Sequence, residues 1–249
     1  MRSTGTTAAR MNVAPDVLDW ARGVLSLAFV LLLPLLLIST SLRGLVTDRE
    51  LMLRGFRDNQ VALTTGLDDA QLERIADLFV AYFQGPPGPI QMQVTAFGQS
   101  RPLFNDREVT HMEDVQALIQ WFLRMQIVVA GVAVIRLVFV FAFDRSPLPF
   151  GRELLWSAGL LVALVALVGV LSFIDFTELW TRFHQIAFRN DLWQLDPSSD
   201  YLIMLFPEPF WYTATIRMAT SVALQTGIVV VSGLVLVFGP RFFGGDRGA

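Results

Sequence analysis

The sequence predicts a mainly α-helical membrane protein, with four transmembrane helices and an extracytoplasmic α+β cap that contains a small hairpin. Composition is the first observation: of 249 residues, 53% are hydrophobic and 16% charged, and the mean hydropathy is +0.52. Soluble domains are less apolar. Four apolar stretches explain the excess, and each is long enough to cross a bilayer as a helix, which needs about 20 residues. They are Gly23–Leu42, Met125–Phe143, Leu154–Ile174 and Met218–Pro240.

The composition also excludes several classes of protein. Four such stretches exclude a soluble enzyme, and a formal net charge of −3 offers no basic surface for nucleic acid. The chain has no cysteine, which excludes disulfides, thiolate metal ligands and a cysteine nucleophile. We expect the first stretch to be a span rather than a cleaved signal peptide, because it is too long for a signal-peptide core. The partners should be lipidic or membrane-borne.

Four spans place both ends of the chain and one short turn on the same side of the membrane. Arginine is denser in these parts, and the positive-inside rule then makes them cytoplasmic. We therefore expect cytoplasmic segments at 1–22, 144–153 and 241–249. The longer segments, 43–124 and 175–217, should be extracytoplasmic.

The first extracytoplasmic segment should begin with two helices. Thr47 or Asp48 can cap a short helix at its N-terminus. Residues 67–84 then repeat apolar side chains at helical spacing, which predicts an amphipathic helix. The glycine and proline run at 85–89 ends it.

A hairpin and one long helix should follow. Residues 90–97 and 101–104 flank a turn that contains Gly98, which is typical of a β-hairpin. From Glu108 onward the pattern is helical, without a breaker before Ser146. We therefore expect one helix that runs from this segment through the second span.

In the second extracytoplasmic segment, residues 176–190 should continue the helix of the third span. A turn at 196–199 should cap a short apolar helix that ends at 206–207, and Pro209 fits the first turn of the fourth span. Aromatic residues typical of a membrane interface also occur here. They are Trp180, Trp193, Trp211 and Tyr212.

Arg136 is the one charge within a predicted span. A charge in a span is a functional hypothesis by default. However, Arg136 lies about 10 Å along the helix from Phe143, at 1.5 Å per residue. We therefore expect its side chain to extend to the cytoplasmic interface.

The chain has two histidines, His111 and His184, and the predicted topology lets them meet on the extracytoplasmic side. Histidine is suited to proton transfer near neutral pH. Two unrelated interfacial histidines are the simpler alternative. Glu108 and Asp114 lie three residues before and after His111, so either can orient its ring. The alternative is that Glu108 and Glu113 serve the helix N-terminus, and for these acids individually we favour it.

Around His184, between 180 and 197, aromatic residues alternate with groups that can bond an ester or a lipid headgroup. Such a stripe is more often packing than a substrate pocket. Arg182 and Trp193 are the candidate substrate-binding residues, with membrane anchoring as the alternative for Arg182.

These stretches resemble the lipoprotein intramolecular transacylase family, the Lit-type membrane proteins of bacteria. The order of four spans and two loops agrees as well. Gln116 departs from the resemblance, since we expect lysine there in many members. The matching strings are Asn-x-Arg-Glu-x-x-His-Met-x-Asp-Val at 105–115, Phe-His-Gln at 183–185, Asn-x-x-Trp at 190–193 with Leu-Asp at 195–196, and Leu-Phe-Pro-Glu at 205–208.

The resemblance implies an enzyme that moves the sn-2 acyl chain of a lipoprotein's diacylglyceryl-cysteine to the α-amino group of the same cysteine. The product is a lyso-form lipoprotein. His111 and His184 match the family's motif histidines and are therefore the candidate catalytic residues. We expect no cofactor and no metal. The implied partners are diacylated bacterial lipoproteins and membrane lipid, with no nucleic acid and no obligate protein partner. The resemblance also implies that the protein lies in the bacterial cell membrane, with its active site on the extracytoplasmic side.

The residue types suit this chemistry. An α-ammonium must lose a proton before it attacks the ester, and the departing alkoxide must gain one, so two histidines can supply base and acid. No enzyme nucleophile is needed, because donor and acceptor belong to one molecule. Candidates that stabilise the oxyanion are Asn105, Asn190 and a protonated histidine.

Two other functions remain open from the sequence. A metal-dependent membrane hydrolase would use both histidines with Glu108 or Asp114, although the chain has no His-Glu-x-x-His pattern. A non-catalytic membrane sensor or assembly factor would use histidines that respond to pH.

Overall fold

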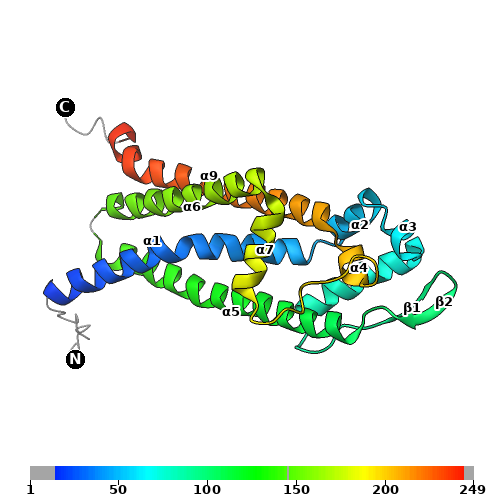
Figure 1. The fold of residues 1–249 in the computed structure, drawn as a ribbon. Coiled ribbons are helices and arrows are strands. Elements are labelled where there is room, and N and C mark those ends of the chain that lie inside the picture. The colour runs from blue at the N-terminus through cyan, green and yellow to red at the C-terminus, as the bar shows by residue number, and fades with distance from the viewer. Residues whose placement is uncertain (1–14, 145, 244–249) are drawn as a thin grey trace, which may run out of the picture.

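The structure is a computed structural model, and it describes residues 15–144 and 146–243. In this part of the chain, four long helices lie side by side and form a bundle (Figure 1). Each contains one of the apolar stretches, and all four are long and apolar enough to cross a membrane. The prediction of four membrane-spanning helices is confirmed. They are α1 (Pro15–Val46), α5 (Asp106–Phe143), α6 (Leu148–Ile174) and α9 (Glu208–Phe243).

The bundle packs closely where side chains are small and is apolar outside. A Cβ added to Gly151 of α6 or to Gly233 of α9 would come within 3.0 Å of the other glycine's carbonyl oxygen. Small residues let two helices approach in this way. Large apolar side chains such as Phe141 and Phe173 point outward, with 83% and 88% of their surface exposed. Such a surface suits contact with lipid rather than water.

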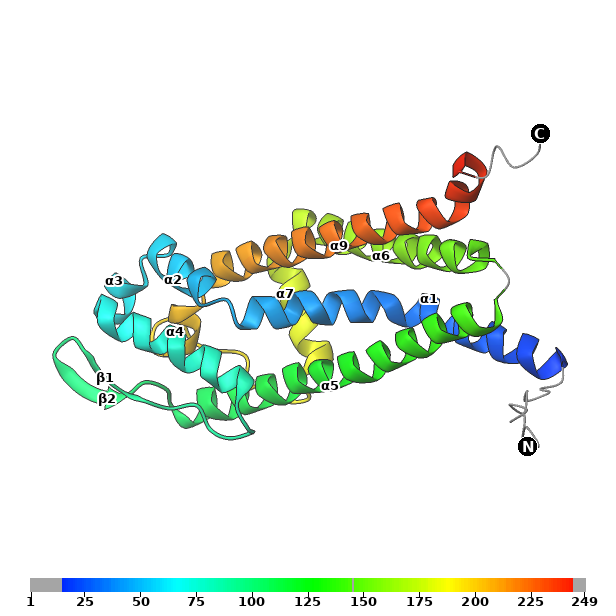
Figure 2. The same cartoon turned by 180° about the vertical axis from the view of Figure 1, so that it is seen from behind.

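Three shorter helices gather at one end of the bundle (Figures 1 and 2). Helix α2 (Arg49–Asp58) begins at Asp48, whose side chain accepts a hydrogen bond from the Leu51 N–H, so the predicted cap is confirmed. Helix α3 (Val61–Thr65) is a single turn. Helix α4 (Asp69–Gln84) is the predicted amphipathic helix, and it ends where the glycine and proline run begins.

The predicted hairpin is present but shorter than expected. Strands β1 (Gln93–Ala96) and β2 (Gln99–Pro102) pair antiparallel, with Ala96 opposite Gln99. The two turn residues, Phe97 and Gly98, both have positive φ, 50° and 79°. A two-residue turn of this kind matches the twist of the strands that it joins.

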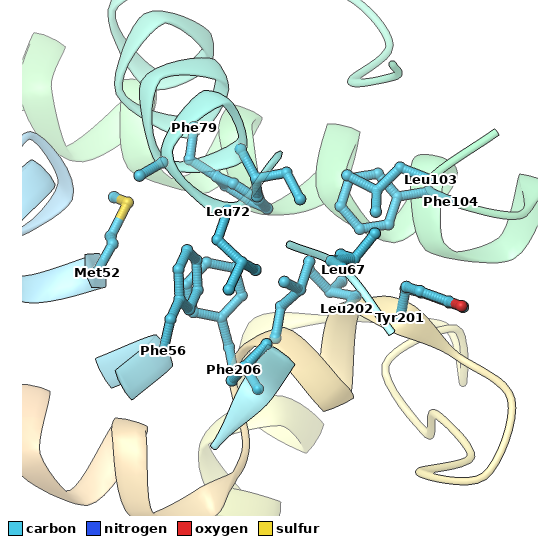
Figure 3. Close-up of a cluster of buried hydrophobic side chains, with 14 of the residues drawn as sticks. Met52, Phe56, Leu67, Leu72, Phe79, Leu103, Phe104, Tyr201, Leu202 and Phe206 are labelled. Carbon is cyan, nitrogen blue, oxygen red and sulfur yellow. The ribbon is translucent and has the colours of Figure 1, made fainter. Parts of the chain in front are cut away.

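A hydrophobic core holds this end together (Figure 3). Phe79 of α4 is central: its ring centroid lies 4.8 Å from that of Phe206 and 6.0 Å from that of Phe104. Phe206 follows the short helix α8 (Tyr201–Leu205), and Phe104 precedes α5. The two long segments outside the spans therefore share one core, and this core fixes where α5 begins.

Helix α5 is continuous from Asp106 to Phe143, as predicted. The helix of the third span, in contrast, does not continue beyond the span as predicted. Helix α6 ends at Ile174, and α7 (Phe176–Ala187) is a separate helix that crosses the bundle (Figures 1 and 2). Asp175 separates them, because its backbone is extended and its side chain accepts a hydrogen bond from the Glu178 N–H. Aspartate at such a position caps a new helix rather than continuing the old one.

The Arg136 side chain extends toward the end of α5, and there it forms ion pairs that the sequence did not predict. The guanidinium is fully buried and bonds both oxygens of Glu153 on α6, at 2.9 and 2.7 Å. It also donates to Asp144 at the end of α5, at 3.1 Å, and Asp144 accepts from Arg22 of α1 at 2.8 Å. A buried charge is retained when opposite charges satisfy it. These ion pairs therefore join three helices. The spacing of these residues along the chain did not indicate that they pair.

Candidate functional site

The two long segments are joined at the first turn of α5. Asn105 and Glu108 form a capping box: the Asn105 side chain accepts from the Glu108 N–H, and a Glu108 oxygen accepts from the Asn105 N–H. The second Glu108 oxygen accepts from the Leu202 N–H at 2.6 Å. The Asn105 amide also donates to Asp200 at 2.9 Å. The Asn-x-x-Glu part of the motif therefore holds the start of α8 against α5.

The loop that follows α7 is tied to the same helix. Arg107 donates to the backbone carbonyl of Asp191 at 2.8 Å, and the Asn190 amide donates to Asp114 at 2.8 Å. At the other end of α7, the Thr177 hydroxyl donates to Glu208 of α9 at 2.9 Å. These contacts fix α7 across the bundle and place its C-terminal turn beside α5.

His111 and His184 meet at this place. Their ring centroids are 6.1 Å apart, with an angle of 35° between the ring planes. Both residues are buried, at 6% and 8% exposure. The structure therefore brings together the two histidines that the sequence singled out.

The His184 ring is held by its own helix and surrounded by aromatic rings. Its Nδ1 lies 2.8 Å from the Trp180 carbonyl oxygen, which only accepts, so Nδ1 carries the proton and Nε2 carries the lone pair. Burial lowers the pKa of His184, although the bond to Trp180 opposes this effect. The ring is therefore neutral at pH 7. The surrounding rings belong to Trp180, Phe183, Phe188 and Trp193, with centroids 4.7 to 5.6 Å away.

His111 is held less tightly. Its ring packs edge-on against Phe188 at 5.1 Å, and its buried Nδ1 has no hydrogen-bond partner among the described residues. His111 lies several turns before the apolar stretch of α5 that begins at Met125, so it is outside the membrane-spanning part of that helix. Burial, followed by the neighbouring His184, lowers the pKa of His111 to about 4. A buried polar atom without a partner is unusual and marks a candidate functional group.

The carboxylates expected near His111 have other partners. Both Glu108 oxygens bond backbone N–H groups, and Asp114 accepts from Asn190. No hydrogen bond in the described part of the chain joins an imidazole to a carboxylate. The group that orients His184 is instead a backbone carbonyl, that of Trp180. Sequence reasoning missed it because a carbonyl leaves no signal in residue type.

The expected substrate-binding residues lie in different surroundings. Trp193 contacts the His184 ring, at 5.1 Å between centroids. Arg182 is exposed and forms an ion pair with Glu178 at 2.6 Å. Trp180, which we expected at a membrane interface, stacks on Trp211 at 4.7 Å and helps to enclose His184.

Gln116, the departure from the family pattern, is buried and donates to the Tyr82 carbonyl oxygen at 2.7 Å, so it supports the turn after α4.

The site can carry protons between two neutral imidazoles inside an apolar enclosure. The side chains of Asn105 and Asn190 each already donate to a carboxylate, which leaves a histidine N–H as the better-placed donor to an oxyanion. Within the described ranges, no three histidine or carboxylate side chains gather as a metal-binding group. The metal-dependent hydrolase therefore gains no support from the geometry.

Comparisons with known proteins fit this arrangement. The family model of the lipoprotein intramolecular transacylase Lit matches residues 27–211. An uncharacterised protein of Aquifex aeolicus is 24% identical over 224 residues, which cover 90% of this chain and 98% of the relative.

Solved structures share the fold. The membrane-integral lipoprotein intramolecular transacylase Lit from Bacillus cereus matches with a TM-score of 0.77 and 15% identity, over 90% of this chain and 99% of that chain. A form of the same protein with a histidine-to-arginine substitution matches with a TM-score of 0.73 and 15% identity, over 91% of this chain and 96% of that chain. At this identity the likeness shows the fold alone.

Proposed function

Because the chain belongs to the lipoprotein intramolecular transacylase family, we propose that it moves the sn-2 acyl chain of a diacylglyceryl-cysteine to the α-amino group of that cysteine. The observation that carries the proposal is the pair of neutral, buried imidazoles with centroids 6.1 Å apart. The substrate brings both the nucleophile and the acyl donor. The enzyme has to position them and to move one proton.

In this mechanism His184 is the proton carrier. The deprotonated α-amine attacks the sn-2 ester carbonyl, so that a C–N bond forms and a tetrahedral oxyanion develops. His184 Nε2 takes the proton released from the nitrogen, since its Nδ1 is already bonded to the Trp180 carbonyl. The C–O bond to the glycerol then breaks, and His184 returns the proton to the departing oxygen. One proton has moved from nitrogen to oxygen, and the enzyme is unchanged.

His111 acts as a neutral donor in the same step. Its lowered pKa keeps the ring uncharged at pH 7, so it offers one N–H to the oxyanion. A neutral imidazole serves as an electrophile in this way in other enzymes. An oxyanion donor is worth about 3–4 kcal/mol of transition-state stabilisation.

The acyl chains reach the site from the side, through the lipid. Phe183 and Ile186 on α7 are 43% and 87% exposed and lie close in the chain to His184. Moving acyl chains into water would cost about 0.8 kcal/mol for each CH₂ group. Entry between helices avoids this cost. We place the site on the extracytoplasmic side, where lipoproteins carry their lipid.

A crossover experiment tests the proposal. Two model lipoproteins with different N-terminal peptides, one of them with a deuterated sn-2 acyl chain, are mixed in proteoliposomes with the purified protein. Mass spectrometry of the N-terminal peptides should show each N-acyl chain on the peptide that originally carried it, together with a lyso-glyceryl group. Exchange of label between peptides would contradict the intramolecular step. Loss of the chain as free fatty acid would indicate a hydrolase.

A further inference from the structure

A second candidate site lies between the end of α1, the end of α4 and the middle of α5. It is a pocket of about 730 Å³, which is within the range of small-molecule sites. Its lining combines two arginines with an apolar wall. The arginines are Arg43 and Arg124, and the apolar residues are Val46, Phe83, Leu123 and Ile127.

Both arginines lie at the boundary of the apolar spans. Arg43 directly follows the first apolar stretch, which ends at Leu42, and Arg124 directly precedes the second, which begins at Met125. The two side chains therefore lie at the level where lipid headgroups meet the hydrocarbon, on the side of the two long segments. Ile127 lies one turn further into the apolar stretch and is 70% exposed.

Neither arginine has a negatively charged partner among the described residues. Arg43 donates to the Gln126 side chain at 3.2 Å, and Arg124 donates to the Gln120 side chain at 3.1 Å; both acceptors are neutral amides. Arginines on α2 behave differently, since Arg54 and Arg57 form ion pairs with Glu50. The pocket thus holds two positive charges whose counter-charge is not supplied by the described chain.

The pocket is distinct from the histidine pair. Gln120, which also lines it, follows His111 by nine positions (120 − 111), or about two and a half helical turns. The two residues therefore face opposite sides of α5.

We propose that this pocket binds an anionic glycerophospholipid of the membrane, with its phosphate between Arg43 and Arg124. Arginine is the preferred partner of phosphate, because its planar guanidinium donates two parallel hydrogen bonds. The acyl chains would lie along α5 past Leu123 and Ile127. The diacylglyceryl group of the proposed substrate has no phosphate, so this ligand is chemically different from the substrate. The proposal does not depend on the proposed reaction.

Native mass spectrometry of the purified protein in detergent tests the site. Three probes separate the sources of affinity: dimyristoyl phosphatidylglycerol, dimyristoylglycerol and inorganic phosphate. We expect a one-to-one complex with the phospholipid and binding of the neutral lipid that is at least about tenfold weaker, since the neutral lipid offers no charged phosphate oxygen to the two guanidinium groups. Equal binding of both lipids would overturn the role of phosphate. Binding of inorganic phosphate as tight as that of the phospholipid would overturn the lipid.

A double variant locates the site. Arg43→Gln with Arg124→Gln should weaken the phospholipid complex about tenfold, whereas Arg54→Gln with Arg57→Gln removes the same charge from α2 and should leave it unchanged. Equal effects of the two double variants would show that net charge, not this pocket, binds the lipid. If the first double variant does not fold, the selectivity of the unaltered protein among the three probes still decides between the outcomes.

Discussion

The Glu108 carboxylate accepts a hydrogen bond of 2.6 Å from the backbone N–H of Leu202, and this bond joins the start of α5 to the start of α8. The other Glu108 oxygen completes the capping box with Asn105. The residue is buried at 1% exposure, so no water replaces either contact. Glu108 is therefore a residue that holds the two segments of the site together.

Glu108→Gln should lower the free energy of unfolding by about 1–3 kcal/mol, because the glutamine amide places an N–H₂ group against one backbone N–H. Thermal unfolding in detergent measures this change. Glu113→Gln, on the exposed side of the same helix, is the matched control and should melt like the unaltered protein. A Glu108→Gln variant with unchanged melting would show that these two bonds do not hold the segments together.

His111→Gln and His184→Gln should each remove nearly all lyso-form product, with losses of about 10²–10⁴-fold. The double variant should lose little more, since groups that act in one step are not additive. Mass spectrometry of the lipoprotein N-terminus measures the product. Glutamine is used rather than alanine, because both rings are buried and alanine would leave a cavity. Substantial product from both single variants would contradict the mechanism.

Protonation of His184 should lower the rate only below pH 6.5. Burial lowers the pKa of His184 below its usual value of 6.5, so the proton-accepting form persists in mild acid. The α-amino group of the substrate, with a usual pKa of about 8, should limit the rate instead as the pH falls from alkaline values. The pH profile of product formation, measured with the substrate below saturation, separates the titration of His184 from that of the substrate α-amino group. A histidine limb centred at or above 6.5 would contradict the neutral pair.

Stability should fall in the same acid range. The unfolded chain binds protons on its histidines as the pH falls through about 6.5, whereas the folded state keeps His111 neutral to about pH 4. The free energy of unfolding is therefore unaffected above 6.5 and decreases between these two values. Melting temperatures of the unaltered protein and of His111→Gln across this range measure the effect. The variant should lose less stability on acidification; an equal loss would place the proton uptake elsewhere.

Arg136→Gln should destabilise the protein by about 3–5 kcal/mol, because it leaves the carboxylate of Glu153 buried without its positively charged partner, whereas Asp144 keeps Arg22. Adding Glu153→Gln should restore part of the loss, since one uncompensated charge is then removed. Thermal unfolding of the single and double variants in detergent measures both. If Arg136→Gln melts normally, the ion pair with Glu153 does not hold α5 and α6 together.

Much of the fold was predictable from local patterns. Long apolar runs can only be satisfied as helices in a bilayer, which predicts the four long helices. Capping residues such as Asp48 and breakers such as Gly98 act within a few residues, so α2, α4 and the hairpin were also predictable. Helix α3 was not predicted, and no side chain caps its start. The break between α6 and α7 was missed, although Asp175 carries the signal of a helix start.

The site was predictable only in part. The histidines and the motif strings around them were visible in the sequence, as was a role of Glu108 at the helix N-terminus as one of two alternatives. The Trp180 carbonyl that orients His184 was not visible, because a backbone carbonyl leaves no signal in residue type. The approach of His184 to His111 was not visible either, because it depends on the direction in which α7 crosses the bundle. The acidic partners of Arg136 were hidden for a similar reason.

The sequence by itself thus determined the membrane spans, the short elements and the residue types available for proton transfer. These follow from the transfer of apolar side chains out of water and from hydrogen bonds between residues close in the chain. Only the tertiary structure decided which distant groups meet: His111 with His184, Glu108 with the Leu202 N–H, and Arg136 with Glu153. Such contacts join residues far apart in the chain, and they depend on how whole helices pack, which no local pattern encodes.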